Sequence, residues 1–164
     1  VGKGCRTSGI DCLNYLVADA LELVPDSLEY LGHLKTPEVF RFCAIPQVMA
    51  IATLEACFNN PKVFTGVVKI RKGLTARLLL DSKSLDGVHF WFGELAQRAL
   101  DRCPADDRSR SKIVAAAQAV VDLTSARASA RRRTAMLVRG AALVAAGAVA
   151  WHAFGEELWT TYMQ

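Results

Sequence analysis

The sequence has few of the residues that build metal centres and disulfide frameworks. It holds three histidines and five cysteines, and no two cysteines form a CxxC pair. An odd number of scattered cysteines suggests no disulfide framework, and no Cys/His spacing fits a zinc site. No apolar run near the N-terminus is long enough for a signal peptide. A reduced protein that faces the cytosol is therefore expected.

Strand patterns are also missing, and apolar residues recur at helical spacing, which predicts an all-α chain. Between Cys12 and Leu34 the helix should kink or split at Pro25, because proline removes a donor and crowds the preceding turn. Thr36-Pro37-Glu38 predicts a helix start with a hydroxyl cap. Asn59-Asn60 before Pro61 predicts the end of that helix, with an asparagine in the left-handed conformation.

Three more helices follow from the same signals. They are expected around Leu74 to Leu80, from Ser84 as N-cap to Cys103, and, after a polar surface loop, from about Ser111 to Ala130. An acidic face on the first helix (Asp19, Glu22, Asp26, Glu29) admits a metal-binding stripe, but a solvated helix face is the favoured interpretation.

The last apolar stretch, residues 134–154, has the length of a membrane span. An arginine cluster precedes and enters it, which predicts a cytosolic domain on the near side and anionic lipid contact. Aromatic residues at its far end and beyond suit the far interface. The cluster comprises Arg127, Arg131, Arg132, Arg133 and Arg139, and the aromatic residues are Trp151, Trp159 and Tyr162. An amphipathic or buried helix is the alternative.

The stretch from Phe42 to Gly73 is the most informative. Its apolar half carries Pro46 inside a helix, and Gln47 is an amide that needs a hydrogen-bond partner in apolar surroundings. For an arbitrary sequence, Phe42 and Gln47 would be core residues. The basic half alternates Val68 and Ile70 with Lys69 and Arg71, so an extended segment would point both cations to one side. Two such cations can hold a phosphate, although a solvated basic loop is commoner.

The amino-acid sequence of this region resembles that of the squalene synthase family, the farnesyl-diphosphate farnesyltransferases. The resemblance is carried by FCAIPQVMAIATLEACFNN from Phe42, VFTGVVKIRKG from Val63 and CLNYLVADALELVPDSLEYLGHL from Cys12. The resemblance is weaker in CPADDRSRSK and covers roughly residues 12–121. The tail resembles the family's membrane tail in character but not in sequence. The expected organisation is a leader (1–11), the C-terminal part of the catalytic domain (12–103), a linker with an Ala-rich helix (104–133), an anchor (134–154) and a tail (155–164).

The resemblance implies an all-α isoprenoid-synthase fold that condenses two farnesyl diphosphates to presqualene diphosphate and reduces it to squalene with NADPH. It implies that Phe42 lines the cavity of the second step, that Gln47 is a candidate wall residue, and that Lys69 and Arg71 recognise the phosphates of NADPH. It further implies an endoplasmic reticulum membrane protein with its catalytic part in the cytosol. The oligomeric state stays open.

The family's Mg²⁺-binding aspartate motifs have no counterpart here, because no Asp–Asp pair occurs at i,i+4. The chain is therefore expected to be a fragment, inactive alone, whose Mg²⁺ ligands lie in a preceding part, and to bury its core poorly. The alternative is a catalytically inactive, tail-anchored helical membrane protein. Nucleic-acid binding through Arg131 to Arg133 is disfavoured, because no aromatic residue is interleaved with that cluster.

Overall fold

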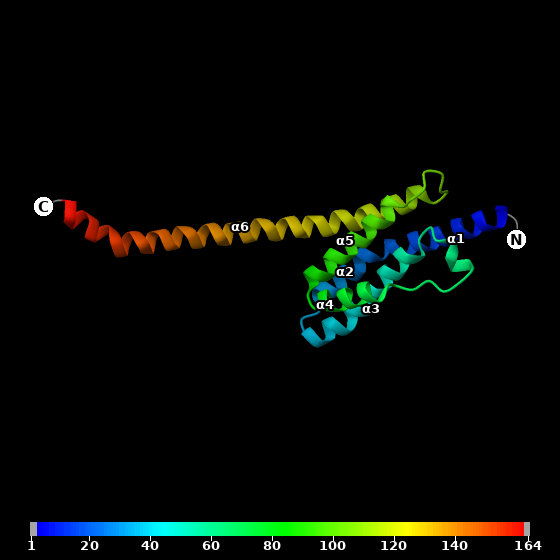
Figure 1. The fold of residues 1–164 in the computed structure, drawn as a ribbon, viewed down its shortest axis with the longest axis horizontal. Coiled ribbons are helices and arrows are strands. Elements are labelled where there is room, and N and C mark those ends of the chain that lie inside the picture. The colour runs from blue at the N-terminus through cyan, green and yellow to red at the C-terminus, as the bar shows by residue number, and fades with distance from the viewer. Residues whose placement is uncertain (1–2, 163–164) are drawn as a thin grey trace. The chain divides into compact units, whose positions relative to one another are not determined.

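The computed structural model describes residues 3–162, apart from the side chains of residues 3–8, 147 and 150–162. All regular elements in this range are helices, and no strand occurs among them, so the all-α prediction is confirmed (Figure 1). The elements are α1 (Lys3–Glu22), α2 (Val24–His33), α3 (Pro37–Cys57), the 3-10 helix η1 (Pro61–Phe64), α4 (Lys72–Asp81), α5 (Leu85–Asp101) and α6 (Arg110–Tyr162).

Two compact units divide the chain, Val1–Arg127 and Ala128–Gln164. The first unit contains α1 to α5 and the beginning of α6. The described part of the second unit is the remainder of α6. The sequence predicted that the Ala-rich helix ends at about Ala130, but α6 continues through residues 130–134. The physical reason is local, since alanine and arginine are strong helix formers and neither glycine nor proline interrupts them there.

Proline sets the helix boundaries at the start of the chain. Leu23 separates α1 from α2, and Pro25 lies in the first turn of α2, so the predicted split is confirmed. Thr36 is the N-cap of α3 as expected, but its hydroxyl makes no capping hydrogen bond, which corrects that detail. Pro46 stands inside α3, where the missing N–H leaves the carbonyl of Phe42 without its helical donor.

The end of α3 follows the predicted asparagine signal. The helix ends at Cys57, and Asn59 adopts the left-handed conformation with φ 49°. Asn60 caps η1 by accepting a hydrogen bond from the backbone N–H of Lys62 at 3.1 Å. Because only a few residue types tolerate positive φ, this pair redirects the chain sharply from α3 into the following connector.

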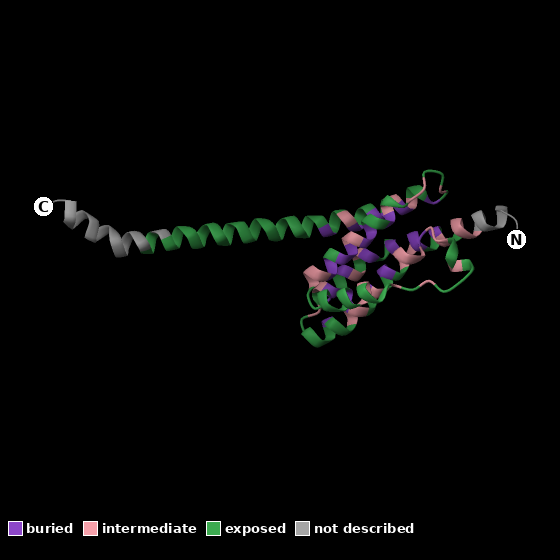
Figure 2. Ribbon diagram, viewed as in Figure 1, coloured by how far each residue is buried: buried purple, intermediate pink, exposed green. Residues whose placement is uncertain are grey.

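The core of the first unit lies where α3 packs against α5, its most extensive helix partner (Figure 2). Small residues on both helices, such as Ala44, Ala52 and Ala96, allow close packing beside Phe92 and Val48. The apolar residues of α5 share one buried face, which comprises Val88, Phe92, Leu95, Ala96 and Ala99, with Leu85 partly buried. The beginning of α6 adds Ile113, Ala117 and Val120 to this core.

Asn14 is a fully buried polar residue that connects three segments. From α1, its side-chain amide donates to the Asp107 carboxylate in the loop before α6. Its side-chain oxygen accepts a hydrogen bond from the backbone N–H of Asn59 at 2.8 Å. A buried amide with satisfied donors and acceptors stabilises one arrangement of the segments it joins, since each alternative leaves a polar group unpaired.

One helix of the described residues, α3, is long and apolar enough to cross a membrane, with a mean hydropathy of 1.4. It packs against α1, α2, α4 and α5, and 28% of its most apolar stretch is buried. Of the span expected at residues 134–154, the side chains of 147 and 150–154 lie outside the described residues, as do those of Trp151, Trp159 and Tyr162. The membrane anchor therefore stays a prediction.

We expect Asn14→Leu to lower the free energy of unfolding by about 2–3 kcal/mol, because it leaves the Asn59 N–H and the Asp107 carboxylate without their partner. Urea unfolding of the native protein would measure this. The control is Gln118→Leu, which removes an exposed amide that bonds only Asp122 within α6 and should change stability by less than about 0.5 kcal/mol. Equal stability of the two variants would contradict a structural role for Asn14.

Gly87 permits a close approach at the start of α5. Its N–H donates to the Ser84 hydroxyl at 3.1 Å, which confirms the predicted cap, and a Cβ at this position would lie 1.9 Å from the carbonyl oxygen of Asp81. We expect Gly87→Ala to lower the melting temperature by several degrees, because it forces the α4–α5 turn apart. In Gly73→Ala the added Cβ meets nothing within 4 Å, so that control should melt at or slightly above the wild-type temperature.

Candidate functional site

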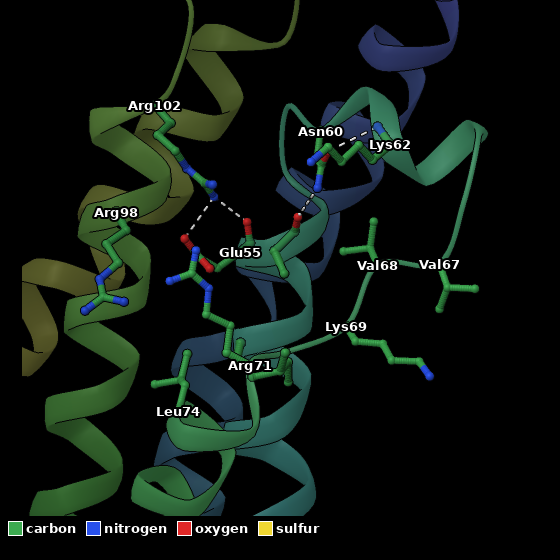
Figure 3. Close-up of a pocket in the computed structure, with 13 residues that line it drawn as sticks. Glu55, Asn60, Lys62, Val67, Val68, Lys69, Arg71, Leu74, Arg98 and Arg102 are labelled. Carbon is green, nitrogen blue, oxygen red and sulfur yellow. Dashed lines mark hydrogen bonds and ion pairs between the residues drawn. The ribbon is translucent and has the colours of Figure 1, made fainter.

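A cavity of about 480 Å³ lies beside the C-terminal end of α3. Its walls are the last turns of α3, the connector (residues 60–71) with Leu74 at the start of α4, and the end of α5 (Figure 3). The floor has apolar parts, including Ala52, Val68 and Leu74. The cavity is of a size that holds a small ligand or part of a cofactor.

The lining of this cavity is strongly cationic. Five basic residues line it, against a single acidic residue, Glu55. The basic residues are Lys62, Lys69, Arg71, Arg98 and Arg102. Clustered cations of this kind create a positive potential that attracts phosphate-bearing ligands, and guanidinium groups match phosphate geometry with paired hydrogen bonds.

Ion pairs engage only part of this charge. Arg102 pairs with the Glu55 carboxylate at 3.0 Å and also donates to the Glu55 backbone carbonyl. Arg98 pairs at 2.9 Å with Glu94, which does not line the cavity. Among residues whose side chains the structure describes, no carboxylate comes within ion-pair distance of Lys62, Lys69 or Arg71. These three cations can therefore bind an anionic ligand without first breaking an ion pair.

The connector positions Lys69 and Arg71 as an extended segment. The alternation predicted from sequence is present, since Val68 and Ile70 are half-buried and the two cations are exposed. The expectation that both cations point to one side is wrong. In Figure 3 Arg71 extends toward Glu55, while Lys69 extends away from it. Arg71 is the N-cap residue of α4, and its backbone angles of φ −63° and ψ 136° are close to polyproline II, which repeats every three residues, so the two side chains need not share a side.

Phe42 and Gln47 are both exposed on α3, so the expectation that they are core residues is wrong. The Phe42 ring is 81% exposed, the joint highest value among the described large apolar side chains. Val39 and Pro46 lie beside it on an open apolar face of the helix. Five residues of helix separate Phe42 and Gln47 by about 140° around the axis, so the two side chains point in different directions.

Tyr30 and Cys43 adjoin this open face, and the sequence did not single Tyr30 out. The Cys43 thiol beside Tyr30 raises the pKa of the phenol. Tyr30 belongs to α2 and is 56% exposed. Helices α2 and α3 together therefore present an aromatic, apolar surface. The signal that could have found Tyr30 is helical spacing, since it lies on the opposite face of α2 from the buried Leu28 and Leu31.

The cationic wall formed by α5 was also missed. Arg98 and Arg102 are four residues apart and therefore share one helix face, a spacing that could have shown them as a pair. Glu55, the partner of Arg102, is 47 residues away from it in the sequence, and no local pattern connects the two.

Possible metal ligands do not gather in the part of the chain that the structure describes, where no group of three His, Cys, Asp or Glu side chains is placed to hold an ion. Of the acidic face on the first helix, Asp19 and Glu22 pair with Lys112, and Asp26 and Glu29 are exposed. The solvated-face interpretation fits this arrangement, with Lys112 as an added partner. The four cysteines whose side chains are described are free thiols.

The chain is similar to several curated proteins of one kind, although no family model matches it. It is 48% identical to squalene synthase of Mus musculus over 103 residues, which cover 63% of this chain and 25% of that protein. It is 57% identical to squalene synthase ERG9 of Candida albicans over 90 residues, covering 55% of this chain and 20% of that protein. The chain thus matches about a quarter of the length of these curated relatives.

A solved structure supports the same relationship. The structure of TcSQS in complex with the ligand E5700 superposes with a TM-score of 0.72 at 37% sequence identity. The match covers 76% of this chain and 36% of that one. About three quarters of this chain therefore shares its helical arrangement with TcSQS.

Proposed function

Since this chain belongs to the squalene synthase family, as a homologue of its C-terminal portion, we propose that the native protein joins two farnesyl diphosphates head to head and reduces the presqualene diphosphate intermediate to squalene. This portion is proposed to supply part of the chamber for the second, reductive step. The observation that carries the proposal is that one helix, α3, bears an open aromatic face at one end and a cationic cavity at the other.

The open face of α3 is proposed to line the chamber in which a carbocation is held. The face of the Phe42 ring offers the negative side of its quadrupole to a positive charge. Val39 and Pro46 beside it are apolar, so they exclude water that would otherwise capture the cation. Gln47 is proposed as a wall residue at a different point of the chamber, because it faces away from Phe42.

The cationic cavity is proposed to hold the phosphates of NADPH, which supplies a hydride when bound. Arg71 extends into the cavity and Lys69 lines its rim, and neither is held by a carboxylate among the described side chains. Glu55 in the cavity lies 13 residues after Phe42, which is about 20 Å along a helix. An extended dinucleotide is a ligand that reaches from one site toward the other.

Magnesium is proposed to be bound by carboxylates that precede this portion in the complete protein. The described residues hold no group of ligands that fits it, so no step on this chain is assigned to the metal. The diphosphate of the substrate is proposed to bind with it.

Membrane attachment through residues 134–154, at the endoplasmic reticulum with the catalytic part in the cytosol, belongs to the same proposal. It is supported by exposed apolar side chains along the described part of that stretch, including Leu137, Leu143 and Val144. A catalytically inactive, membrane-bound role is the competing function. Conversion of radiolabelled farnesyl diphosphate to squalene by the native protein decides between them, since the competing role predicts no product.

For Phe42→Ala in the complete enzyme, we expect presqualene diphosphate to accumulate while squalene output falls at least about tenfold, because the cation loses its aromatic partner. Product analysis by chromatography would measure both compounds. Phe90→Ala is the matched control, since it removes another exposed phenylalanine, on α5, and should leave the product ratio unchanged. An unchanged ratio in Phe42→Ala would remove this residue from the reaction.

For Lys69→Ala and Arg71→Ala, we expect the KM for NADPH to rise about tenfold or more, with a smaller effect on the KM for farnesyl diphosphate, because each change deletes a charge-assisted contact. Steady-state kinetics with each substrate varied in turn would measure this. Lys83→Ala removes an exposed lysine outside the cavity and serves as the control. If the KM for farnesyl diphosphate rose more, these residues would bind the substrate instead.

A further inference from the structure

The second cationic wall of the cavity, on α5, has no role in the function proposed so far. Arg98 and Arg102 come from one face of this helix and stand across the cavity from the connector that carries Arg71 (Figure 3). An NADPH molecule has two separate phosphate groups, the diphosphate bridge and the 2′-phosphate of the adenosine ribose. Two cationic walls on separate elements match two phosphate groups on one ligand.

Arg102 is already oriented for binding. One of its terminal nitrogens, Nη2, contacts both the carboxylate and the backbone carbonyl of Glu55. A second contact also positions this residue, since its backbone carbonyl accepts a hydrogen bond from the Asn59 side chain at 3.5 Å. A guanidinium has donors on all three nitrogens, so Nε and Nη1 remain to meet a phosphate. A side chain held in place in this way loses less conformational entropy when a ligand binds.

Glu55 is the residue of this wall that can distinguish a ribose 2′-hydroxyl from a 2′-phosphate. In dinucleotide-binding proteins a carboxylate accepts a hydrogen bond from a free ribose 2′-hydroxyl, whereas an arginine accommodates a 2′-phosphate. Here both residue types meet as an ion pair at the cavity wall, with 3.0 Å between Arg102 Nη2 and Glu55 Oε1. Glu55 is also the only carboxylate among the residues that line this cavity.

We propose that the Glu55–Arg102 pair reads the 2′ position of the nicotinamide cofactor, with Arg102 binding the 2′-phosphate and Glu55 opposing it. This inference rests on the proposed use of NADPH. Arg98 adds charge to the same wall, while Arg71 and Lys69 hold the diphosphate. The pair thus sets how strongly the site prefers NADPH over NADH.

Two substitutions at the pair separate binding from a merely structural role. Arg102→Gln and Glu55→Gln both break the ion pair, but only the first removes the cation. We expect Arg102→Gln to raise the Kd for NADPH about tenfold or more with little change for NADH, as loss of a charge-assisted contact requires. We expect Glu55→Gln to leave NADPH binding intact or tighter and to weaken NADH, so the preference for NADPH rises.

The measurement is a fluorescence titration of the native protein with NADPH and with NADH, which needs no turnover. Arg108→Gln is the charge control, since it removes an exposed arginine from the neighbouring loop outside the cavity. It should leave both constants within about twofold, because exposed charges are screened by solvent and salt. Thermal unfolding of each variant verifies that it is folded.

Each outcome has a distinct meaning. Opposite shifts of the NADPH preference in the two variants establish the proposal. Equal weakening in both variants, for both cofactors, overturns it in favour of a structural ion pair. Equal weakening of NADPH and NADH by Arg102→Gln alone overturns the 2′ assignment and places the diphosphate at α5. If NADPH binding is insensitive to Arg102→Gln but lost in Arg71→Ala, this inference fails and the proposed function stands; insensitivity of all these variants removes NADPH from the cavity altogether.

Discussion

The buried amide of Asn14 holds the segments that form the cavity in one arrangement. Through it, α1 contacts both the left-handed residue Asn59, where α3 ends, and the Asp107 loop, from which α6 begins. Asp107 in turn accepts a hydrogen bond from the backbone N–H of Ser109 at 2.7 Å. Because a buried amide cannot exchange these partners for water, the direction in which the chain leaves α3 is fixed by a residue more than forty positions earlier. The connector to Arg71 inherits that direction.

Charge then decides what the resulting cavity can bind. The connector contributes cations to one wall of the cavity, and α5 contributes two arginines to the opposite wall. Within the lining, only Glu55 offsets this positive charge. Concentrating like charges in this way costs stability through mutual repulsion, and proteins accept such a cost chiefly at binding sites. The open apolar face around Phe42 is a second feature that packing alone does not explain, since large exposed apolar side chains mark surfaces that bind something.

Local signals in the sequence predicted most of the fold. Pro25, Asn59 and Ser84 each act through the geometry of their own few neighbours, and the structure places helix boundaries at all three. The helix expected to end near Ala130 continues instead, because the alanine and arginine residues that follow have high helix propensity. The sequence singled out Phe42 and Arg71, whose proposed roles stay predictions, and it missed the Glu55–Arg102 pair. Contacts between residues far apart in sequence produce no local periodic pattern, so only the folded structure shows them.

Helix α3 fixes the distance and the relative rotation between the two proposed sites. A helix advances in fixed steps of about 1.5 Å and turns about 100° with each residue. Between Phe42 and Glu55, many side chains can change without altering where either end points. A single inserted or deleted residue, in contrast, would swing one end around the axis relative to the other and separate the aromatic face from the cationic wall. The length of this segment is therefore restricted, so related chains should keep the number of residues between these two positions.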